Sequence, residues 1–273
     1  MKRKNHDQSH TFVICAYRES PYLVDCIKSL RAQTVPSGII MITSTPNPYI
    51  SGIAETYGIE YHVNDREKGI AGDWNYAYRI AHSRYVTLAH QDDIYRKDYV
   101  KEVLKAMGRA ENPVIAFTDY HELRNGELQK DSTMLKVKRF LLLPLILPLF
   151  HKSRFVRRRI LSLGCPVCCP SVTYHKDNLP EQIFKAGYRS DVDWQAWELL
   201  SKRKGEFVYI RKPLTVHRIH EESATTAIIG DHVRSKEDYE MFRRFWPACI
   251  ARALVRLYAK SERSNELKKK SKD

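Results

Sequence analysis

Two adjacent carboxylates, Asp92 and Asp93, directly follow an apolar and β-branched run at residues 85–89. A run of that length and composition predicts a buried strand, so the two carboxylates stand where a strand ends. In open α/β sheets, ligands bind outside the carboxyl ends of the strands. Carboxylate oxygens there suit a hard divalent cation that also binds phosphate. The alternative is a polar turn in which Asp92 or Asp93 caps the next helix.

A second pair of carboxylates, Asp191 and Asp193, precedes an amphipathic helical pattern that contains Trp194 and Trp197. Either aspartate could cap the first amides of that helix. A carboxylate near a helix start can also act as a general base when a hydroxyl group reaches it, and indole rings offer a flat apolar face to a sugar ring. The residues themselves leave both roles open.

Two histidines and an arginine follow a predicted strand at residues 207–210. His217 and His220 are three residues apart, and Arg218 lies between them. Two imidazoles and a guanidinium at this spacing suit a metal ion or a pyrophosphate group. A lone histidine is more often structural, so neither imidazole carries the prediction by itself.

The elements that must position these groups alternate between strand and helix. Apolar runs predict strands at residues 11–16, 38–43, 59–63, 85–89 and 114–119, and helical spacing falls between them, including a helix at 97–107. Strands joined by helical crossovers pair in parallel, which predicts a doubly wound α/β sheet. The loops after these strands then gather at one edge of the sheet. Residues 124–127 predict a hairpin turn.

Composition narrows the class of partner. The 273 residues carry 46 basic and 32 acidic side chains, a formal charge of +14, which indicates an anionic partner. Residues 1–10 lack the apolar core of a signal peptide, so we expect a cytoplasmic protein whose six cysteines are reduced thiols. The pair Cys165 and Cys168 has the spacing of half a zinc site, but no second pair follows at a suitable distance.

Residues 136–159 contain eight basic side chains and no acidic ones around an apolar run at 140–150. The run is much shorter than the ~20 residues needed to cross a bilayer, and Pro144 and Pro148 interrupt it. One interpretation is an interfacial segment whose basic flanks contact anionic headgroups; these are Lys136, Lys138, Arg139, Arg154, Arg157, Arg158 and Arg159. The other is a buried apolar segment with solvated flanks.

Five stretches, taken in order, resemble the motifs of family 2 glycosyltransferases, which have the GT-A fold. They are residues 11–19 (TFVICAYRE), 69–75 (GIAGDWN), 91–93 (QDD), 193–197 (DWQAW) and 217–223 (HRIHEES). The resemblance implies a Rossmann-like, mostly parallel sheet flanked by helices, with a C-terminal helical extension. It implies a glycosyltransferase domain over 11–230, with a nucleotide-sugar half (11–120) and an acceptor half (121–230), a disordered N-terminus (1–10), C-terminal helices (231–260) and a basic tail (261–273).

The resemblance also implies roles for single residues. The nucleotide-sugar donor would be held by Ala16, Tyr17, Glu19, Ser44, Asn64, Asp73, His90, Gln91 and Arg218. A divalent cation, Mg²⁺ or Mn²⁺, would be bound at Asp92, with Asp93, His217 and His220 as further ligands. The first acid of the family's usual Asp-X-Asp is replaced by His90. The stretch that begins at Ser44 lacks the acidic residue with which the family often binds uracil.

Alignment on the two tryptophans implies that Asp193 is the catalytic base, with Asp191 as the second choice. The implied reaction is metal-dependent, inverting transfer from a nucleotide-diphosphate sugar, with a UDP-sugar as the expected donor. The acceptor would be a saccharide or a polyprenyl-linked saccharide in surface polysaccharide biosynthesis, and the enzyme would sit at the inner face of the membrane. The rivals are a nucleotidyltransferase on a similar sheet and a non-catalytic basic protein that binds membrane or nucleic acid.

Overall fold

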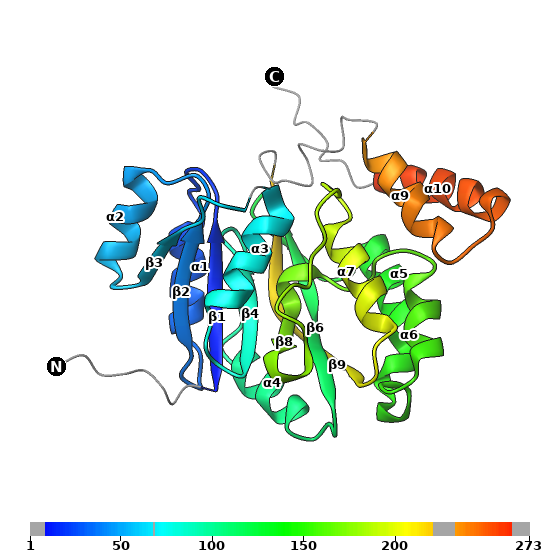
Figure 1. The fold of residues 1–273 in the computed structure, drawn as a ribbon, viewed down its shortest axis with the longest axis horizontal. Helices are drawn as coiled ribbons and strands as arrows, with labels where there is room; N and C mark the ends of the chain where they lie inside the picture. The colour runs from blue at the N-terminus through cyan, green and yellow to red at the C-terminus, as the bar shows by residue number, and fades with distance from the viewer. Residues whose placement is uncertain (1–8, 68, 221–232, 264–273) are drawn as a thin grey trace.

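The computed structural model describes residues 9–67, 69–220 and 233–263, and it contains one mixed sheet flanked by helices (Figure 1). The strands lie in the order β3-β2-β1-β4-β8-β6-β9-β5, and β7 pairs with β6. Their bounds are β1 His10–Ala16, β2 Gly38–Thr43, β3 Glu60–Val63, β4 Tyr85–His90, β5 Ile94–Tyr95, β6 Pro113–Arg124, β7 Glu127–Gln129, β8 Val172–His175 and β9 Glu206–Ile219.

The first four strands confirm the predicted parallel pattern and bring their carboxyl ends level. Ala16 pairs with Thr43, Cys15 with His90, and Thr43 with Val63. The loops that follow these strands therefore leave the sheet at one edge, where ligands of such sheets bind.

The other half of the sheet departs from the purely parallel expectation. The short strand β8 inserts between β4 and β6 and pairs antiparallel with both. Strand β5, which the sequence did not predict, pairs antiparallel with β9, and it delays the start of the next helix to Tyr99. The predicted hairpin is confirmed: Asn125 and Gly126 both have positive φ, 49° and 82°, as a two-residue hairpin turn requires.

Helices cover both faces of the sheet because its strands alternate their apolar side chains. In β1, Phe12 and Ile14 belong to one core cluster and Val13 belongs to the other. The helices are α1 Leu23–Arg31, α2 Pro48–Thr56, α3 Gly69–Ile80, α4 Tyr99–Met107, α5 Thr133–Leu142, α6 Arg154–Leu161, α7 Val192–Ser201, α9 Val233–Arg243 and α10 Ala248–Arg263.

The apolar run at 140–150 is partly buried and partly exposed, and its contact with a membrane stays a prediction. It forms the end of α5 and two short 3₁₀ helices, η1 Leu143–Ile146 and η2 Pro148–Phe150. Leu142 and Leu145 are buried in the core, whereas Phe140 and Leu149 are 70% and 78% exposed. One side of the segment therefore anchors it to the protein and the other side faces outward.

Several of the basic flanking residues do not reach outward as predicted. Arg157 is buried under Phe207 and donates to the carbonyls of Arg203 and Gly205. Arg139 pairs with Asp119 at 2.8 Å, and Lys138 donates to the Tyr120 hydroxyl at 2.9 Å. These residues stabilise the interior because carbonyls, a carboxylate and a hydroxyl lie beneath them.

The C-terminal extension consists of α9 and α10, as expected for 231–260. Predictions for residues 1–8, 221–232 and 264–273 lie outside the described part of the chain, but His10 belongs to β1 rather than to a disordered N-terminus. Within the described ranges, no helix combines the length and apolarity needed to cross a bilayer. The domain boundaries stay a prediction.

Candidate active site

The residues expected to hold the nucleotide meet at the carboxyl ends of β1, β2 and β3. The Asp73 carboxylate, at the start of α3, accepts hydrogen bonds from Ser44 Oγ and Asn64 Nδ2, both at 2.7 Å. Ser44 follows β2 and Asn64 follows β3. Burial raises the pKa of Asp73, and these two hydrogen bonds oppose the shift. A polar cluster thus joins the ends of two strands to a helix.

The loop after β1 is held to the loop after β4. Gln91 exchanges two hydrogen bonds with the backbone of Tyr17, accepting from its N–H at 3.0 Å and donating to its carbonyl at 2.8 Å. Ala16 ends β1 and is buried, and the side chains of Tyr17 and Glu19 are exposed. This leaves the Tyr17 ring open to a ligand at the sheet edge.

Buried Asp93, which follows β4, pairs with partly exposed His217 of β9. His217 Nδ1 lies 3.0 Å from Asp93 Oδ1, and the Arg218 N–H donates to the same oxygen at 2.8 Å. Asp93 is fully buried. Burial alone would lower the pKa of His217, but the Asp93 carboxylate raises it to about 9, so the imidazole is charged at neutral pH.

Asp92 forms a separate pair with His220. His220 Nε2 lies 2.9 Å from Asp92 Oδ2, and Arg218 Nε donates to the Asp92 carbonyl at 3.0 Å. Burial alone would raise the pKa of Asp92. The hydrogen bond with His220 and the charges of His90, His217 and His220 nevertheless hold it below its usual value. Asp92 is therefore ionised, and its side chain is partly exposed, whereas the side chain of Asp93 is fully buried.

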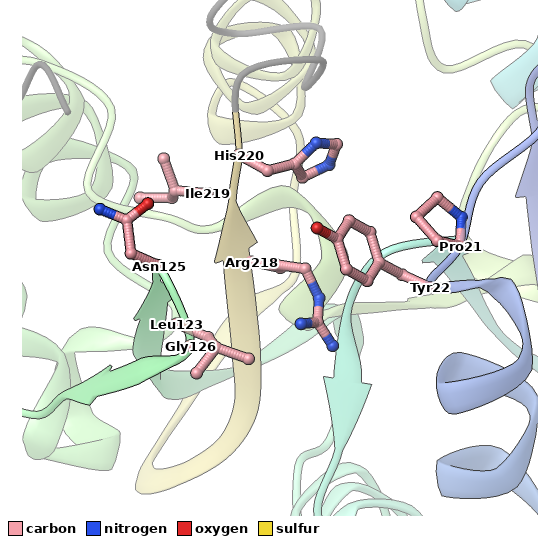
Figure 2. Close-up of a pocket in the computed structure, with 8 residues that line it drawn as sticks. All are labelled: Pro21, Tyr22, Leu123, Asn125, Gly126, Arg218, Ile219 and His220. Atoms are coloured by element: carbon pink, nitrogen blue, oxygen red, sulfur yellow. The ribbon is translucent and has the colours of Figure 1, made fainter. Parts of the chain in front are cut away.

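A pocket of about 460 Å³ opens beside this pair, and Figure 2 shows the residues that line it. Arg218 and His220 extend from β9 toward Tyr22, which precedes α1 (Figure 2). The Arg218 guanidinium lies 4.1 Å from the centre of the Tyr22 ring, and the His220 and Tyr22 ring centres are 5.0 Å apart. A cation stacked on an aromatic face is held in place without losing its charge.

The four predicted metal ligands thus form two pairs rather than one cage. Within the described ranges, no group of three His, Cys, Asp or Glu side chains is arranged to hold a metal ion. Mg²⁺ and Mn²⁺ at phosphate sites need only one or two carboxylates, with substrate phosphates and water as the other ligands. Asp92, ionised and accessible, fits that requirement, whereas buried Asp93 positions β9.

Asp193 lies in the first turn of α7 rather than ahead of the helix, and Asp191 is its N-cap residue without a side-chain capping bond. Asp193 Oδ1 accepts from the Trp194 N–H at 2.7 Å, and Cys165 Sγ lies 3.9 Å from Oδ2. Burial raises the pKa of Asp193. The Trp194 hydrogen bond and the charges of Lys138 and His90 partly oppose this shift.

Asp191 has a different environment from Asp193. Burial and the nearby negative charge of Asp238 raise its pKa well above the usual value. A carboxyl group that retains its proton is a poor general base. The environment of Asp191 therefore favours Asp193 as the base.

The loop that precedes these aspartates is held by Glu237 of α9. Its buried carboxylate accepts hydrogen bonds from the backbone N–H groups of Arg189, Ser190 and Asp191, at 2.8, 2.7 and 3.0 Å. Three donors on one carboxylate fix both the loop and the start of α7.

His90 connects the two acidic parts of the site. Its ring stacks on Trp74, with ring centres 5.3 Å apart, and its Nδ1 lies 3.8 Å from Asp93 Oδ2. The charge of His90 acts on both Asp92 and Asp193. His90 at the end of β4 therefore affects the pKa of carboxyl groups both beside β4 and in α7.

The sequence did not single out Lys138, Tyr22 or Glu237 as part of the site. Lys138 lay in a segment interpreted by its charge alone, and a carboxylate that binds backbone amides leaves no sequence pattern. The sequence pattern also predicted that His217 and Arg218 follow a strand, whereas both lie within β9.

Comparison with known proteins decides the family. The family described as Glycosyl transferase family 2 matches residues 11–177, more than half of the chain. The chain belongs to this family. As a family 2 glycosyltransferase it has the GT-A fold, and this membership favours sugar transfer over the two rival functions.

Solved structures support the same fold. TarS 1–349 of S. aureus in complex with UDP-GlcNAc has a TM-score of 0.62 at 15% identity, covering 91% of this chain and 70% of that one. The mannosyltransferase PcManGT from Pyrobaculum calidifontis in complex with GDP-Man and Mn²⁺ has a TM-score of 0.63 at 13% identity, covering 95% and 76%. A search of curated proteins found no match.

Proposed function

We propose that this family 2 enzyme is a metal-dependent, inverting glycosyltransferase that uses a nucleotide-diphosphate sugar. The observation that carries the proposal is the position of His90 at the end of β4, where it lies two residues before Asp92 and also lowers the pKa of Asp193 in α7. A donor diphosphate at Asp92 and an acceptor hydroxyl at Asp193 would then meet in one site.

The donor half binds and orients the nucleotide. Ala16 and Tyr17, with Glu19 nearby, lie along the loop after β1, and Ser44, Asn64 and Asp73 form the polar cluster beside it. Gln91 fixes the Tyr17 backbone, so the two loops present one rigid surface. Arg218 and His220 line the pocket next to Asp92, where a diphosphate needs positive charge.

A divalent cation held by Asp92 and the donor diphosphate would neutralise the charge that develops on the leaving group. Asp92 is suited to this role because its ionised carboxylate keeps one oxygen, Oδ1, apart from the His220 hydrogen bond. Asp93 and His217 hold β9 in register, so that Arg218 stays aimed at the same group.

Asp193 acts as the general base. It takes the proton of the acceptor hydroxyl as that oxygen attacks the anomeric carbon from the face opposite the leaving group. One displacement inverts the anomeric configuration. The negative charge of Asp193 also favours a transition state with oxocarbenium character. Lys138 and His90 lower the pKa of this partly buried carboxylate and so favour its ionised form.

The donor is a UDP-sugar in this proposal. A structure of the same fold binds UDP-GlcNAc and another binds GDP-Man, so the fold supports both nucleotides. The acceptor is a saccharide or a polyprenyl-linked saccharide of a surface polysaccharide, which a cytoplasmic enzyme would meet at the inner face of the membrane.

The test is a panel of UDP- and GDP-sugars with saccharide and lipid-linked acceptors, each assayed with Mn²⁺, Mg²⁺ or a chelator. We expect metal-dependent transfer from a UDP-sugar, and NMR of the product should show an inverted anomeric centre. Product that retains the configuration, or transfer that persists in chelator, would sink the corresponding part of the proposal.

A further inference from the structure

The exposed apolar side chains of this protein are concentrated at one end. Of the twelve large apolar residues that are exposed in the described chain, nine lie between residues 137 and 163 or in α10. The most exposed are Phe140, Leu149 and Phe155, at 70%, 78% and 70%. Helices α5 and α6 lie at the end of the molecule that is farthest from β3 (Figure 1). Clustered apolar exposure of this kind marks a binding surface rather than scattered surface residues.

A small pocket of about 120 Å³ lies at the same end, between α6 and the turn that joins α9 to α10. Three arginines and two phenylalanines line it with Ser162; they are Arg158, Arg159, Arg244, Phe155 and Phe245. The pocket therefore combines guanidinium groups with the rim of the apolar surface.

The charge of this pocket is only partly balanced. Arg158 and Arg244 share one buried carboxylate, Glu198, at 2.8 and 3.2 Å, and Lys202 also contacts it. Arg159 stacks instead on Phe155 and Trp246, at 5.3 and 5.2 Å from the ring centres. Arg158 also donates to the Arg244 carbonyl, and Arg244 donates to the Tyr188 hydroxyl. Arg159 is therefore the guanidinium best suited to donate to an anion, and phosphate matches its geometry.

We propose that this end of the protein is a docking surface for an anionic phospholipid bilayer. The apolar side chains of Phe140, Leu149 and Phe155 enter the boundary between headgroups and acyl chains. The arginine pocket binds the phosphate of one phospholipid, and exposed Lys136, Lys152 and Arg154 contact neighbouring headgroups. The membrane location rests on the proposed function. Vesicle binding itself requires neither a sugar donor nor an acceptor.

The test is co-sedimentation of the full chain with vesicles of phosphatidylcholine alone or mixed with phosphatidylglycerol, without nucleotide-sugar. We expect the mixed vesicles to bind at least about tenfold more tightly and the binding to weaken in high salt. Because each lost contact is worth about 1 kcal/mol, Arg159→Gln and Leu149→Ser should each weaken binding about fivefold.

Matched substitutions on other parts of the surface serve as controls. Arg66→Gln removes an exposed arginine on the loop after β3, and Leu128→Ser removes an exposed leucine of β7. Both should bind vesicles like the parent. The proposal is overturned if the protein stays in the supernatant with both vesicle types, or if the control variants lose as much binding as the test variants.

A competition experiment distinguishes binding to a bilayer from binding to a soluble anion. Free inorganic phosphate at millimolar concentration should compete weakly, because it offers no apolar layer. Binding that phosphate abolishes and that Leu149→Ser leaves unchanged would show a site for soluble phosphate only, and the docking proposal would fail. Loss of sugar transfer with intact vesicle binding would instead count against the proposed function alone.

Discussion

His217 and Asp93 are 124 residues apart in the sequence, yet His217 Nδ1 and Asp93 Oδ1 lie 3.0 Å apart in the structure. The contact follows from the antiparallel pairing of β5 with β9, which places Ile94 opposite Val216. The pair connects the acidic strand end to the strand that carries Arg218. A buried carboxylate thus sets the position of residues at the protein surface.

We expect Asp93→Ala to lower the free energy of unfolding by about 3 kcal/mol, because it removes a buried carboxylate that binds the His217 imidazolium and leaves the Arg218 N–H without this acceptor. Urea unfolding followed by tryptophan fluorescence measures the change. The control is Asp131→Ala, which removes an exposed carboxylate that pairs with Arg139 and should cost less than about 1 kcal/mol. Equal losses in the two variants would contradict the structural role of Asp93.

Asp193→Asn should lower kcat by at least about 100-fold, because the acceptor hydroxyl then lacks a base. The Kd for donor should stay unchanged, since the substitution preserves the shape of the side chain. Asp191→Asn should have a much smaller effect on kcat, because burial and the charge of Asp238 raise the pKa of Asp191 well above its usual value and make it the weaker base. The reverse order of effects would assign the base to Asp191.

Asp92→Ala should remove the contribution of metal to donor binding. Calorimetric titration of UDP with and without Mn²⁺ measures it, and the variant should bind UDP equally under both conditions. Asp65→Ala removes an exposed carboxylate from the loop after β3 and should keep the metal dependence. If Asp92→Ala still binds UDP more tightly with Mn²⁺, the ion is held elsewhere.

The pH dependence of kcat/KM should reflect the raised pKa of Asp193. Burial raises this pKa. As the pH is lowered, Asp193 therefore takes up a proton at a higher pH than an ordinary aspartate would, and the activity falls at that higher pH. The positive charges that act on Asp193 are those of Lys138, His90 and Arg234, and the Cys165 thiol lies beside it. Lys138→Met removes one of these charges, so the acidic limb should move to higher pH.

Lys136→Met provides the matched control because Lys136 is exposed on the same helix. Its pH profile should match that of the parent enzyme. A Lys138→Met profile with an unmoved acidic limb would show that Lys138 does not act on the base.

Glu237→Gln should lower kcat more than it changes the Kd for donor, because the loop that it holds leads into α7 and not into the nucleotide cluster. Hydrogen bonds to a charged acceptor are worth about 1.5–3 kcal/mol, so a measurable loss of stability should accompany it. Lys236→Met, on the exposed side of the same helix, should leave kcat unchanged. Parallel losses in kcat and donor affinity would indicate general unfolding instead.

The donor half of the fold could be predicted because its strands are continuous apolar runs, and the segments between them have apolar residues at helical spacing. The level carboxyl ends of β1 to β4 then follow from parallel pairing. The convergence of Ser44, Asn64 and Asp73 at one edge therefore needed only the order of strands and helices along the chain.

The acceptor half was harder to predict because its signals are short or interrupted. β8 has four residues, too few for a periodic pattern. In β9, Arg211, Lys212 and Pro213 break the apolar run, so the strand was predicted to end at residue 210. The structure absorbs them with shifts in the pairing of β6 with β9, where Asp119 lies opposite Pro213. Contacts such as that of Lys138 with Tyr120 depend on packing across the sheet.

Helix α5 places two neighbouring residues in opposite surroundings: Lys138 acts on the base inside, and Phe140, two positions along, is exposed outside. With a bilayer docked on the outer side, this one helix would contact lipid on one face and act on the proposed base from the other. Substitutions in α5 would then change vesicle binding and catalysis together, and the two effects are told apart only when both are measured.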